Sequence, residues 1–419
     1  MKTGTATVDI TPEVGCELSG YVARVQPSVG IHDPLFARAL YLEAVGRRLL
    51  WLHTDLIGLE RPFVCGLRDE FERRFGLKPA EVVVSATHTH SGPATLHLIN
   101  LGEYEGGYVA KLRGRLVEVA ARAVAQTEET ETVAAEGHCD LAIDRRGQAS
   151  AHTDPKVGVL AWRRPDGSYA AVLANYAMHN VGWGSDNRRV SADVFGRAAA
   201  TLAEGLPGTP TVLFANGACG NTNPPRHAAD ASDIDTWGDA MAASVAHALE
   251  HAAPADETAF RMAIETVDVP LDVPDEDQVR AFAQDVLDAV EGQTGYVPER
   301  VAASAETWRD LMLGKLADGT APTHVPMDVQ AVRIGSVRLV CLGAEVFSPM
   351  ADELREATGQ TVYVVGYANG EIGYLPTPAA YDEGGYEVCT AFIYYGSFRP
   401  KLGAFEMVRD KAVGLVNGL

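Results

Sequence analysis

Short apolar runs of strand length recur along this sequence, and segments with helical periodicity lie between them. Residues 40–45 and 49–56 are such runs, whereas residues 61–75 place Phe63 and Leu67 four positions apart, at helical spacing. Strands and helices that alternate in this way build layered α/β domains. We therefore predict an α/β fold of layered mixed sheets with flanking helices.

The alternation continues through most of the chain. Further strands are predicted at residues 81–86, 132–136, 157–162, 170–176, 211–215, 260–271, 329–334, 337–342 and 362–365. Helices are predicted at residues 108–125, 233–251, 276–290 and 302–316. We find no internal repeat, low-complexity tract or linker, and we expect one continuous domain over residues 1–419.

Composition excludes several classes of protein. The chain is 47% hydrophobic and 22% charged, as in globular proteins. Its net charge of −21 disfavours a nucleic-acid or anionic-lipid partner. No segment approaches the roughly 18 apolar residues of a membrane span, and the N-terminus lacks the apolar stretch of a signal peptide. We expect a cytoplasmic protein that acts on a small molecule, with a homo-oligomer left open.

Polar segments follow several of the predicted strands. His88 and His90 lie two positions apart after residues 81–86, and His179 follows residues 170–176. Ligands of α/β sheets usually bind at the carboxyl ends of strands, and imidazole is a zinc ligand. The period of two in extended chain predicts that His88 and His90 face the same side. The alternatives are a strand end with two solvated histidines, and a hydrogen-bonded structural role for His179.

Glu345 and Tyr374 also come after predicted strands. Glu345 follows residues 337–342, and a carboxylate at the end of a buried run needs a partner. The alternative is an acid that caps the helix starting near Pro349. Tyr374 follows residues 362–365 and indicates nothing by itself.

Taken in order, these segments resemble the neutral/alkaline non-lysosomal ceramidases, which are zinc amidases. The matching phrases are Asp9-Ile10-Thr11, Gly30-Ile31-His32 with Ala37-Arg38-Ala39, Thr87 to Pro93, Ala177-Met178-His179, Gly343 to Phe347 and Tyr374 to Tyr386. They cover almost the whole chain, and Thr-His-Thr-His-Ser-Gly-Pro is the specific one. The resemblance implies a ceramidase-like catalytic domain without the C-terminal β-sandwich of a full ceramidase.

The resemblance also implies roles for individual residues. Zn²⁺ would be held by His88, His179, Glu345 and Tyr374. His90 would lie beside the metal, and Arg145 would face the reaction centre, although a solvated loop charge is the other interpretation of Arg145.

One position departs from the family pattern. Ceramidases carry a serine in Gly-Asp/Asn-x-Ser-Pro-Asn, whereas residues 220–225 here place Asn223 at that point. An amide cannot form an acyl intermediate, but it can donate a hydrogen bond to an oxyanion. Thr222 is adjacent and would point to the other side of an extended segment. The structural alternative for Asn221 and Asn223 is an Asx-type turn before the two prolines.

We therefore predict a zinc-dependent hydrolase that cleaves an amide C–N bond of a small soluble N-acyl or related metabolite through zinc-activated water. His90, Arg145 and Asn223 are the predicted catalytic residues. The alternatives are zinc-assisted acyl transfer, condensation or elimination on a specialised metabolite, and a catalytically silent ceramidase-like protein. A thiol mechanism through Cys219 is disfavoured because the sequence marks no base for it. The six cysteines form no C-x-x-C pair and are expected to be reduced.

Overall fold

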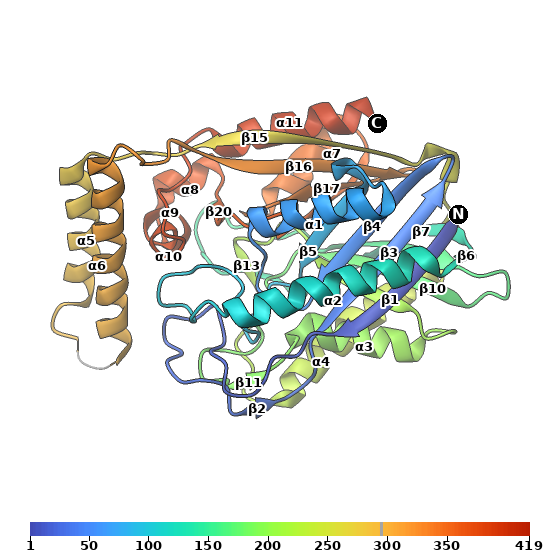
Figure 1. Ribbon diagram of the computed structural model, residues 1–419, viewed down its shortest axis with the longest axis horizontal. Coiled ribbons are helices and arrows are strands. Elements are labelled where there is room, and N and C mark those ends of the chain that lie inside the picture. Colours follow the sequence, from blue (N-terminus) through green and yellow to red (C-terminus); the bar gives the residue numbers. More distant parts are fainter. Residues whose placement is uncertain (294–295) are drawn as a thin grey trace.

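The computed structural model describes residues 1–293 and 296–419, and three mixed β-sheets form its framework (Figure 1). In spatial order, the first sheet contains β5 (Val82–Ala86), β4 (Arg47–Thr54), β3 (Phe36–Ala44), β1 (Lys2–Asp9) and β6 (Thr127–Glu129). The second contains β12 (Thr211–Asn216), β10 (Tyr169–Tyr176), β9 (Lys156–Arg163), β7 (Glu131–His138) and β14 (Ala253–Pro254). The third contains β15 (Arg261–Pro270), β16 (His324–Ile334), β17 (Val337–Leu342) and β19 (Thr361–Val365).

Each sheet is built from the same succession of elements: three antiparallel strands, a helix, a strand that joins the sheet edge in parallel, and a second helix. The helix pairs are α1 (Arg61–Phe75) with α2 (Gly106–Ala125), α3 (Asp193–Gly205) with α4 (Ala231–Leu249), and α7 (Pro349–Thr358) with α11 (Ala404–Gly418). The parallel edge pairs are β4–β5, β10–β12 and β17–β19. The structure thus repeats one arrangement three times, although the sequence shows no internal repeat. The repetition lies in topology, which residue identities do not reveal.

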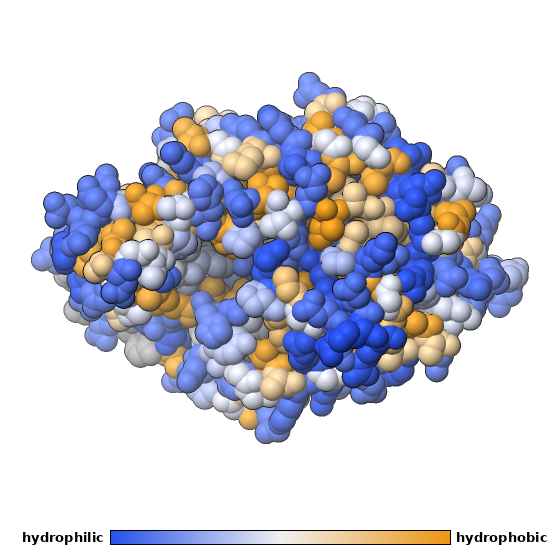
Figure 2. Space-filling model, turned by 45° about the horizontal axis from the view of Figure 1, so that its top comes forward, coloured by the Kyte–Doolittle hydropathy of each residue, from blue (hydrophilic) through white to orange (hydrophobic). Residues whose placement is uncertain are grey.

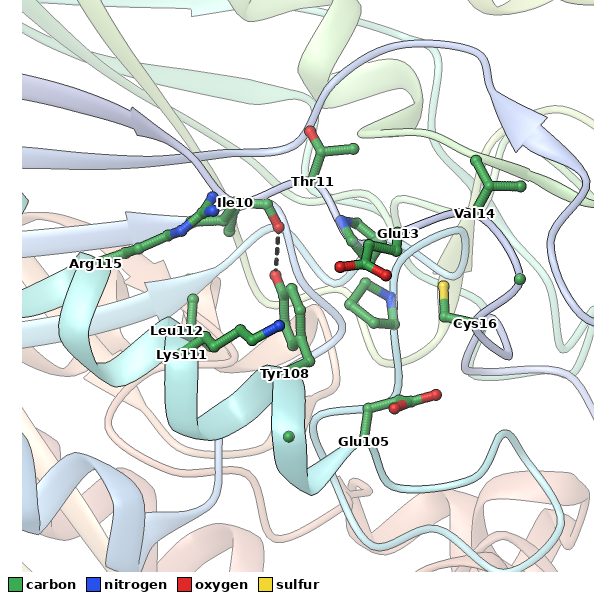
Figure 3. Close-up of a pocket in the computed structure, with 14 residues that line it drawn as sticks. Ile10, Thr11, Glu13, Val14, Cys16, Glu105, Tyr108, Lys111, Leu112 and Arg115 are labelled. Atoms are coloured by element: carbon green, nitrogen blue, oxygen red, sulfur yellow. Dashed lines mark hydrogen bonds between the residues drawn. The ribbon is translucent and has the colours of Figure 1, made fainter.

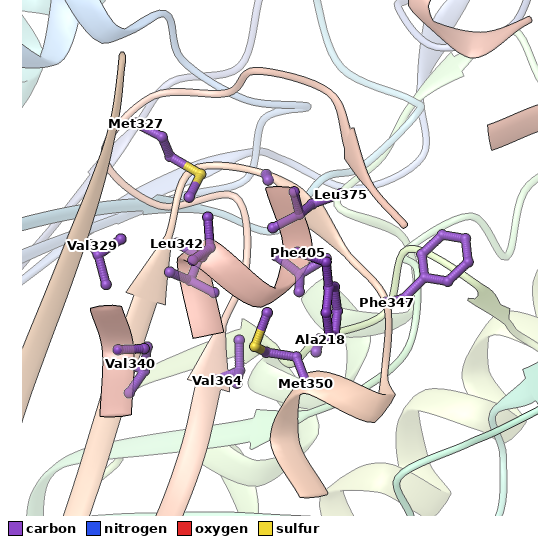
Figure 4. Close-up of a cluster of buried hydrophobic side chains, with 14 of the residues drawn as sticks. Ala218, Met327, Val329, Val340, Leu342, Phe347, Met350, Val364, Leu375 and Phe405 are labelled. Carbon is purple, nitrogen blue, oxygen red and sulfur yellow. The ribbon is translucent and has the colours of Figure 1, made fainter. Parts of the chain in front are cut away.

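The inner faces of the three sheets share one hydrophobic core. Trp51 of β4, Trp162 of β9 and Leu339 of β17 belong to it, and each is fully or almost fully buried. On the outer side, each sheet packs against its own helices: in the third sheet, Leu342 lies in one cluster with Met350 of α7 (Figure 4). Burial of a large apolar side chain contributes about 1.5–3 kcal/mol, so the shared core stabilises the three sheets as a unit.

Buried polar side chains join the sheets in pairs. His53 of β4 donates through Nε2 to a carbonyl of β12 at 3.1 Å, and Asn175 of β10 donates to a carbonyl of β19 at 2.9 Å. Asn369, just after β19, accepts a hydrogen bond from a backbone N–H of β5 at 3.1 Å. Because a buried polar group without a partner is costly, each contact fixes how one sheet meets the next. The segments that follow β5, β10 and β17 consequently come close together.

The predicted α/β class is confirmed, and most predicted elements are present. The helices predicted at residues 61–75 and 276–290 coincide with α1 and with α5 (Glu276–Val290). The N-terminal alternation forms β1. Helices α3 and α11 were not predicted. Helix α3 contains three consecutive alanines, Ala198 to Ala200, and the glycines Gly196 and Gly205. These small residues weaken the apolar periodicity on which the prediction of a helix depends.

Short elements complete the fold. Two-stranded ladders pair β2 (Gly30–Ile31) with β11 (Arg189–Val190), β8 (Ile143–Asp144) with β13 (Thr222–Asn223), and β18 (Glu345–Val346) with β20 (Tyr374–Leu375). The remaining helices are α6 (Tyr296–Ala317), α8 (Pro378–Glu383), α9 (Tyr386–Cys389) and α10 (Ala391–Tyr394), with single 3₁₀ turns at Pro79–Glu81 and Glu257–Ala259. Helices α5 and α6 lie side by side at one end of the molecule (Figure 1). Among the described helices, none is both long and apolar enough to cross a bilayer.

Candidate metal centre

Three segments, each following a strand of a different sheet, bring His88, His179 and Glu345 together. His88 follows β5, His179 follows β10 and Glu345 follows β17. Nε2 of His179 lies 2.9 Å from Oε2 of Glu345, and Nε2 of His88 lies 3.5 Å from the same oxygen. All three side chains are buried. The site therefore lies where the three repeated units meet.

Backbone carbonyls determine which nitrogen of each histidine carries the proton. Nδ1 of His88 donates to the carbonyl of Ile57 at 2.6 Å, and Nδ1 of His179 donates to that of Cys219 at 2.8 Å. Each Nε2 is left with a lone pair, as in metal-bound histidines whose other nitrogen binds a carbonyl. Oε2 of Glu345 is buried and accepts no hydrogen bond from the described residues. Three electron-pair donors thus face one another, an arrangement that fits a divalent cation.

Burial keeps the imidazoles of His179 and His90 neutral. Burial lowers the pKa of His179 to about 4, and burial together with the neighbouring His88 lowers the pKa of His90 well below its usual value. Neutral imidazole is the form that binds metals. The two histidines are therefore uncharged at pH 7.

His90 stands beside this group. Its Nε2 lies 3.1 Å from Nε2 of His88, and its buried Nδ1 has no hydrogen-bond partner among the described residues. The prediction that both imidazoles face the same side is confirmed, but strand periodicity is not the reason. Strand β5 ends at Ala86, and His88 adopts a left-handed conformation with φ of 57°. The ring of Tyr367 stacks on His88 at 3.9 Å and supports this conformation, which costs about 1–3 kcal/mol.

Tyr374 lies directly opposite Glu345 in the parallel ladder of β18 and β20. Opposite residues of a ladder point to the same side, so the two side chains are neighbours. Arg145 donates through Nη2 to the hydroxyl of Tyr374 at 2.9 Å and to the carbonyl of Gly220 at 2.8 Å. Burial raises the pKa of Tyr374 well above its usual value, although Arg145 opposes this. The phenol therefore stays protonated unless a cation binds beside it.

Arg145 is held inside the site. Its Nε donates to Glu387 Oε1 at 2.9 Å, and Nη1 donates to Oδ1 of Asn223 at 3.4 Å. Burial opposes protonation of Arg145, but Tyr374 and Glu387 outweigh it and raise the pKa of the guanidinium. With Oδ1 turned toward Arg145, the NH₂ group of Asn223 points away from the guanidinium. These contacts disfavour the interpretation of Arg145 as a solvated loop charge.

The residues next to Asn223 have structural partners. The hydroxyl of Thr222 donates to the carbonyl of Ala177 at 3.0 Å, which leaves it bound away from Asn223. Asn221 donates to Asp144 at 2.7 Å and accepts from the backbone N–H of Ser348 at 2.7 Å. Asn221 thus ties together three loops around the site.

Cys219 is a poor nucleophile. Its side chain is buried, and burial raises the pKa of the thiol to about 12. Its sulfur lies 3.4 Å from the hydroxyl of Tyr367. The thiol therefore stays protonated and has a structural role, packing near His179.

Three residues of the site were not singled out from the sequence. Tyr395 donates its hydroxyl to Glu345 Oε1 at 2.6 Å, Glu387 anchors Arg145, and Tyr367 stacks on His88. Tyr367 follows a strand of the third sheet, as the predicted ligands follow theirs. The position of Tyr367 after a strand, and the tyrosine-rich sequence that follows it, were the features from which Tyr367 and Tyr395 could have been predicted as site residues.

Two other features of the described residues lie apart from this site. A cavity of about 460 Å³ between residues 10–16 and α2 holds none of the predicted site residues (Figure 3). His247, Glu250 and His251, at the C-terminal end of α4, bring ligand atoms within 4.8 Å of one another, but all three are exposed. These three residues form a surface histidine cluster.

Sequence comparison with known proteins finds similarity in the N-terminal half of the chain. Residues 1–224 match the family described as neutral/alkaline non-lysosomal ceramidase, N-terminal. The chain is 27% identical over 219 residues to a neutral ceramidase of Pseudomonas aeruginosa, covering 47% of this chain and 32% of that protein. It is 24% identical over 244 residues to neutral ceramidase A of Dictyostelium discoideum, covering 51% and 34%. The matched region thus spans about a third of the length of these relatives.

Solved structures extend the likeness to the whole chain. The crystal structure of neutral ceramidase from Pseudomonas aeruginosa superposes with a TM-score of 0.76, covering 100% of this chain and 74% of that one at 19% identity. A structure of a ceramidase complexed with C2 gives the same score and covers 75% of its chain. At this identity the likeness confirms the fold.

Proposed function

Since the chain belongs to the neutral/alkaline non-lysosomal ceramidase family, we propose that it is a zinc-dependent hydrolase that cleaves an amide C–N bond. The observation that carries the proposal is the convergence of Nε2 of His88, Nε2 of His179 and Oε2 of Glu345. Nitrogen and carboxylate ligands of this kind suit zinc. Tyr374, opposite Glu345 in its ladder, would complete the set.

We assign roles in amide hydrolysis to the residues around these proposed ligands. Zinc, when bound, supplies hydroxide at neutral pH because it lowers the pKa of water to about 7. The NH₂ group of Asn223 and the guanidinium of Arg145 bind the carbonyl oxygen, where negative charge develops. Glu387 and Gly220 hold the guanidinium in place before substrate arrives. No side-chain nucleophile is then required at position 223.

His90 moves the proton. Its Nε2 lies on the side of His88, whereas its Nδ1 faces Gly20. Nε2 is therefore the atom that accepts a proton from the nucleophile and returns it to the leaving nitrogen. Burial and the neighbouring His88 lower the pKa of His90, so its imidazole is uncharged at neutral pH before the transfer.

We further propose a small soluble N-acyl compound as substrate. The net charge of −21 opposes adsorption to an anionic lipid surface, where membrane amides would have to be reached. A panel of N-acetyl, N-butanoyl and N-octanoyl p-nitroanilides, with long-chain ceramide in detergent micelles alongside, measures the preference directly. Higher kcat/KM for the ceramide than for every short amide would overturn this part of the proposal.

Metal analysis tests the centre. We expect one tightly bound zinc ion per chain, lost in His88→Ala together with hydrolysis. The double variant His247→Ala/His251→Ala removes the surface histidine cluster and should retain both. Full hydrolytic activity in metal-free His88→Ala would refute the proposal, as would loss of the tightly bound zinc only in the surface double variant.

The replacement of the family serine by Asn223 favours a second candidate, a zinc-assisted acyl transfer without hydrolysis. Turnover in ¹⁸O-labelled water separates the two. Hydrolysis places one solvent oxygen in the carboxylate product, whereas transfer to another nucleophile places none.

A further inference from the structure

Tyr395 connects the candidate metal centre to a neighbouring cavity. It follows α10, and its hydroxyl donates to Oε1 of Glu345 at 2.6 Å. Its ring packs on Gly373, where a Cβ atom would come within 3.1 Å of the ring. Tyr395 also lines a cavity of about 610 Å³ beside residues 97–104. Tyr395 is thus held by packing as well as by its hydrogen bond.

This hydrogen bond determines how the carboxylate of Glu345 is turned. With Oε1 bound to Tyr395, Oε2 is the oxygen that faces His179 at 2.9 Å and His88 at 3.5 Å. The backbone reinforces the arrangement, because the N–H of Glu345 donates to the carbonyl of Gly373 at 2.9 Å. The main chain of Glu345 and the ring of Tyr395 therefore rest on the same glycine.

We propose that Tyr395 is a positioning residue that orients Glu345, so that one carboxylate oxygen is available to the metal and the other is not. The inference rests on the proposed function, because it takes Glu345 as a metal ligand. Partners that bind the free atom of a metal ligand typically raise metal affinity about 10–100-fold. Tyr395 has that relation to Glu345, as Ile57 and Cys219 have to the two histidines.

The test compares Tyr395→Phe with Tyr394→Phe. Both remove one phenol oxygen, and Tyr394 directly precedes Tyr395 in the chain. Zinc affinity is measured by competition with a chromophoric chelator. We expect Tyr395→Phe to bind zinc about 10–100-fold more weakly and Tyr394→Phe to match the wild type. Because phenylalanine keeps the ring on Gly373, far-UV circular dichroism should be unchanged.

A spectroscopic measurement distinguishes a changed orientation of the Glu345 carboxylate from a general loss of order in the site. The visible absorption of the Co²⁺-substituted protein reports ligand geometry and should change in Tyr395→Phe. In a Glu345→Gln background, Tyr395→Phe should have no further effect on metal affinity, since the carboxylate it orients is gone. If Tyr395→Phe does not fold, Tyr395→Met, which offers the carboxylate no hydrogen-bond donor, should bind zinc more weakly than the wild type.

The outcomes separate this inference from the proposed function. A wild-type protein that binds no zinc at the buried site would overturn the proposed function itself. Wild-type zinc binding with equal affinity and an equal Co²⁺ spectrum in Tyr395→Phe would leave the function intact and reject the role of Tyr395. Equal losses in Tyr395→Phe and Tyr394→Phe would reject it too.

Discussion

The side chain at position 223 decides which chemistry the site can support. Its amide has no proton to lose near neutral pH, so it cannot attack a carbonyl. Its Oδ1 accepts from Arg145 at 3.4 Å, which presents the NH₂ group rather than the oxygen to a ligand. On the proposed function, Asn223 and Arg145 are two hydrogen-bond donors to the oxyanion.

Replacing Asn223 with alanine tests this pairing. On the proposed function, Asn223→Ala should lower kcat about 10²–10³-fold, with little change in KM, because the lost donor binds the transition state more tightly than the substrate. Steady-state kinetics on a short N-acyl anilide supply the measurement, and unchanged zinc content is the control. Wild-type kcat in a zinc-loaded Asn223→Ala protein would contradict the role.

The convergence of three predicted ligands was foreseeable at this scale because the residues follow strands in recognisable phrases. His88, His179 and Glu345 all come within a few residues of a strand end. Tyr395 and Glu387 were not predictable, since their roles come from contacts that cross 50 and 242 residues of sequence. No local pattern encodes such a contact.

At the scale of elements, the sheets are joined by polar side chains as well as by apolar packing. His53 is central to the contact between the first and second sheets. Its Nδ1 accepts from the hydroxyl of Ser85 at 2.9 Å, and Nε2 donates to the carbonyl of Phe214 at 3.1 Å. Ser85 in turn accepts from the indole N–H of Trp51 at 2.8 Å. This chain of hydrogen bonds needs a neutral imidazole.

The stability of this junction should depend on pH. Burial, with Arg38 nearby, lowers the pKa of His53 to about 3, against about 6.5 in an unfolded chain. Below pH 6.5 the unfolded chain binds a proton that the folded chain does not, so His53 reduces stability as pH falls toward 3. The loss is about 1.4 kcal/mol per pH unit at most.

Urea unfolding at pH 7.0, 5.5 and 4.5 measures this effect. His53→Gln should be less stable than the wild type at pH 7, and the gap should narrow as the pH falls. His138→Gln, which changes an exposed histidine of β7, should follow the wild type at every pH. A constant gap between His53→Gln and the wild type would contradict the assignment.

Prediction of elements succeeded where periodicity was unbroken. Helix α1 carries buried Val64, Leu67 and Phe71 on one face and ends at Gly76, whose φ of 66° suits glycine. Helix α3 buries Val194, Phe195 and Leu202, but small residues between them hide the spacing. The triplicated order of strands and helices could not be predicted, because it appears only when strand pairing is known.

For the whole molecule, charge is the property that most restricts partners. Figure 2 shows hydrophilic side chains over much of one face, with apolar ones scattered between them. The surplus of acidic residues gives a net charge of −21 and a pI near 4.9. Such a protein repels polyanions at long range.

We therefore expect no binding to nucleic acid. In an electrophoretic mobility shift assay with a 30-base-pair duplex at 50 mM salt, micromolar protein should leave the duplex unshifted. A lysine-rich control protein of similar size verifies the assay. A shift that weakens steeply as salt is raised would contradict the prediction.

The candidate site includes residues that lie outside the range matched by the family. The match covers residues 1–224, which contain both proposed histidine ligands and the Asn223 segment. Glu345, Tyr374 and Tyr395 lie in the third unit, beyond the matched range. The sequence phrases of the third unit were therefore essential to the predicted ligand set.

Each of the three units places one side chain, His88, His179 or Glu345, at the same point. On the proposed function, hydrolytic activity therefore requires that all three units have assembled. A polypeptide severed between the second and third units would yield two inert pieces, one with imidazoles and one with a carboxylate. Only their reassociation would recreate a place for the ion. On the proposed function, a nascent or partly folded chain likewise remains inactive until its third unit has folded against the first two.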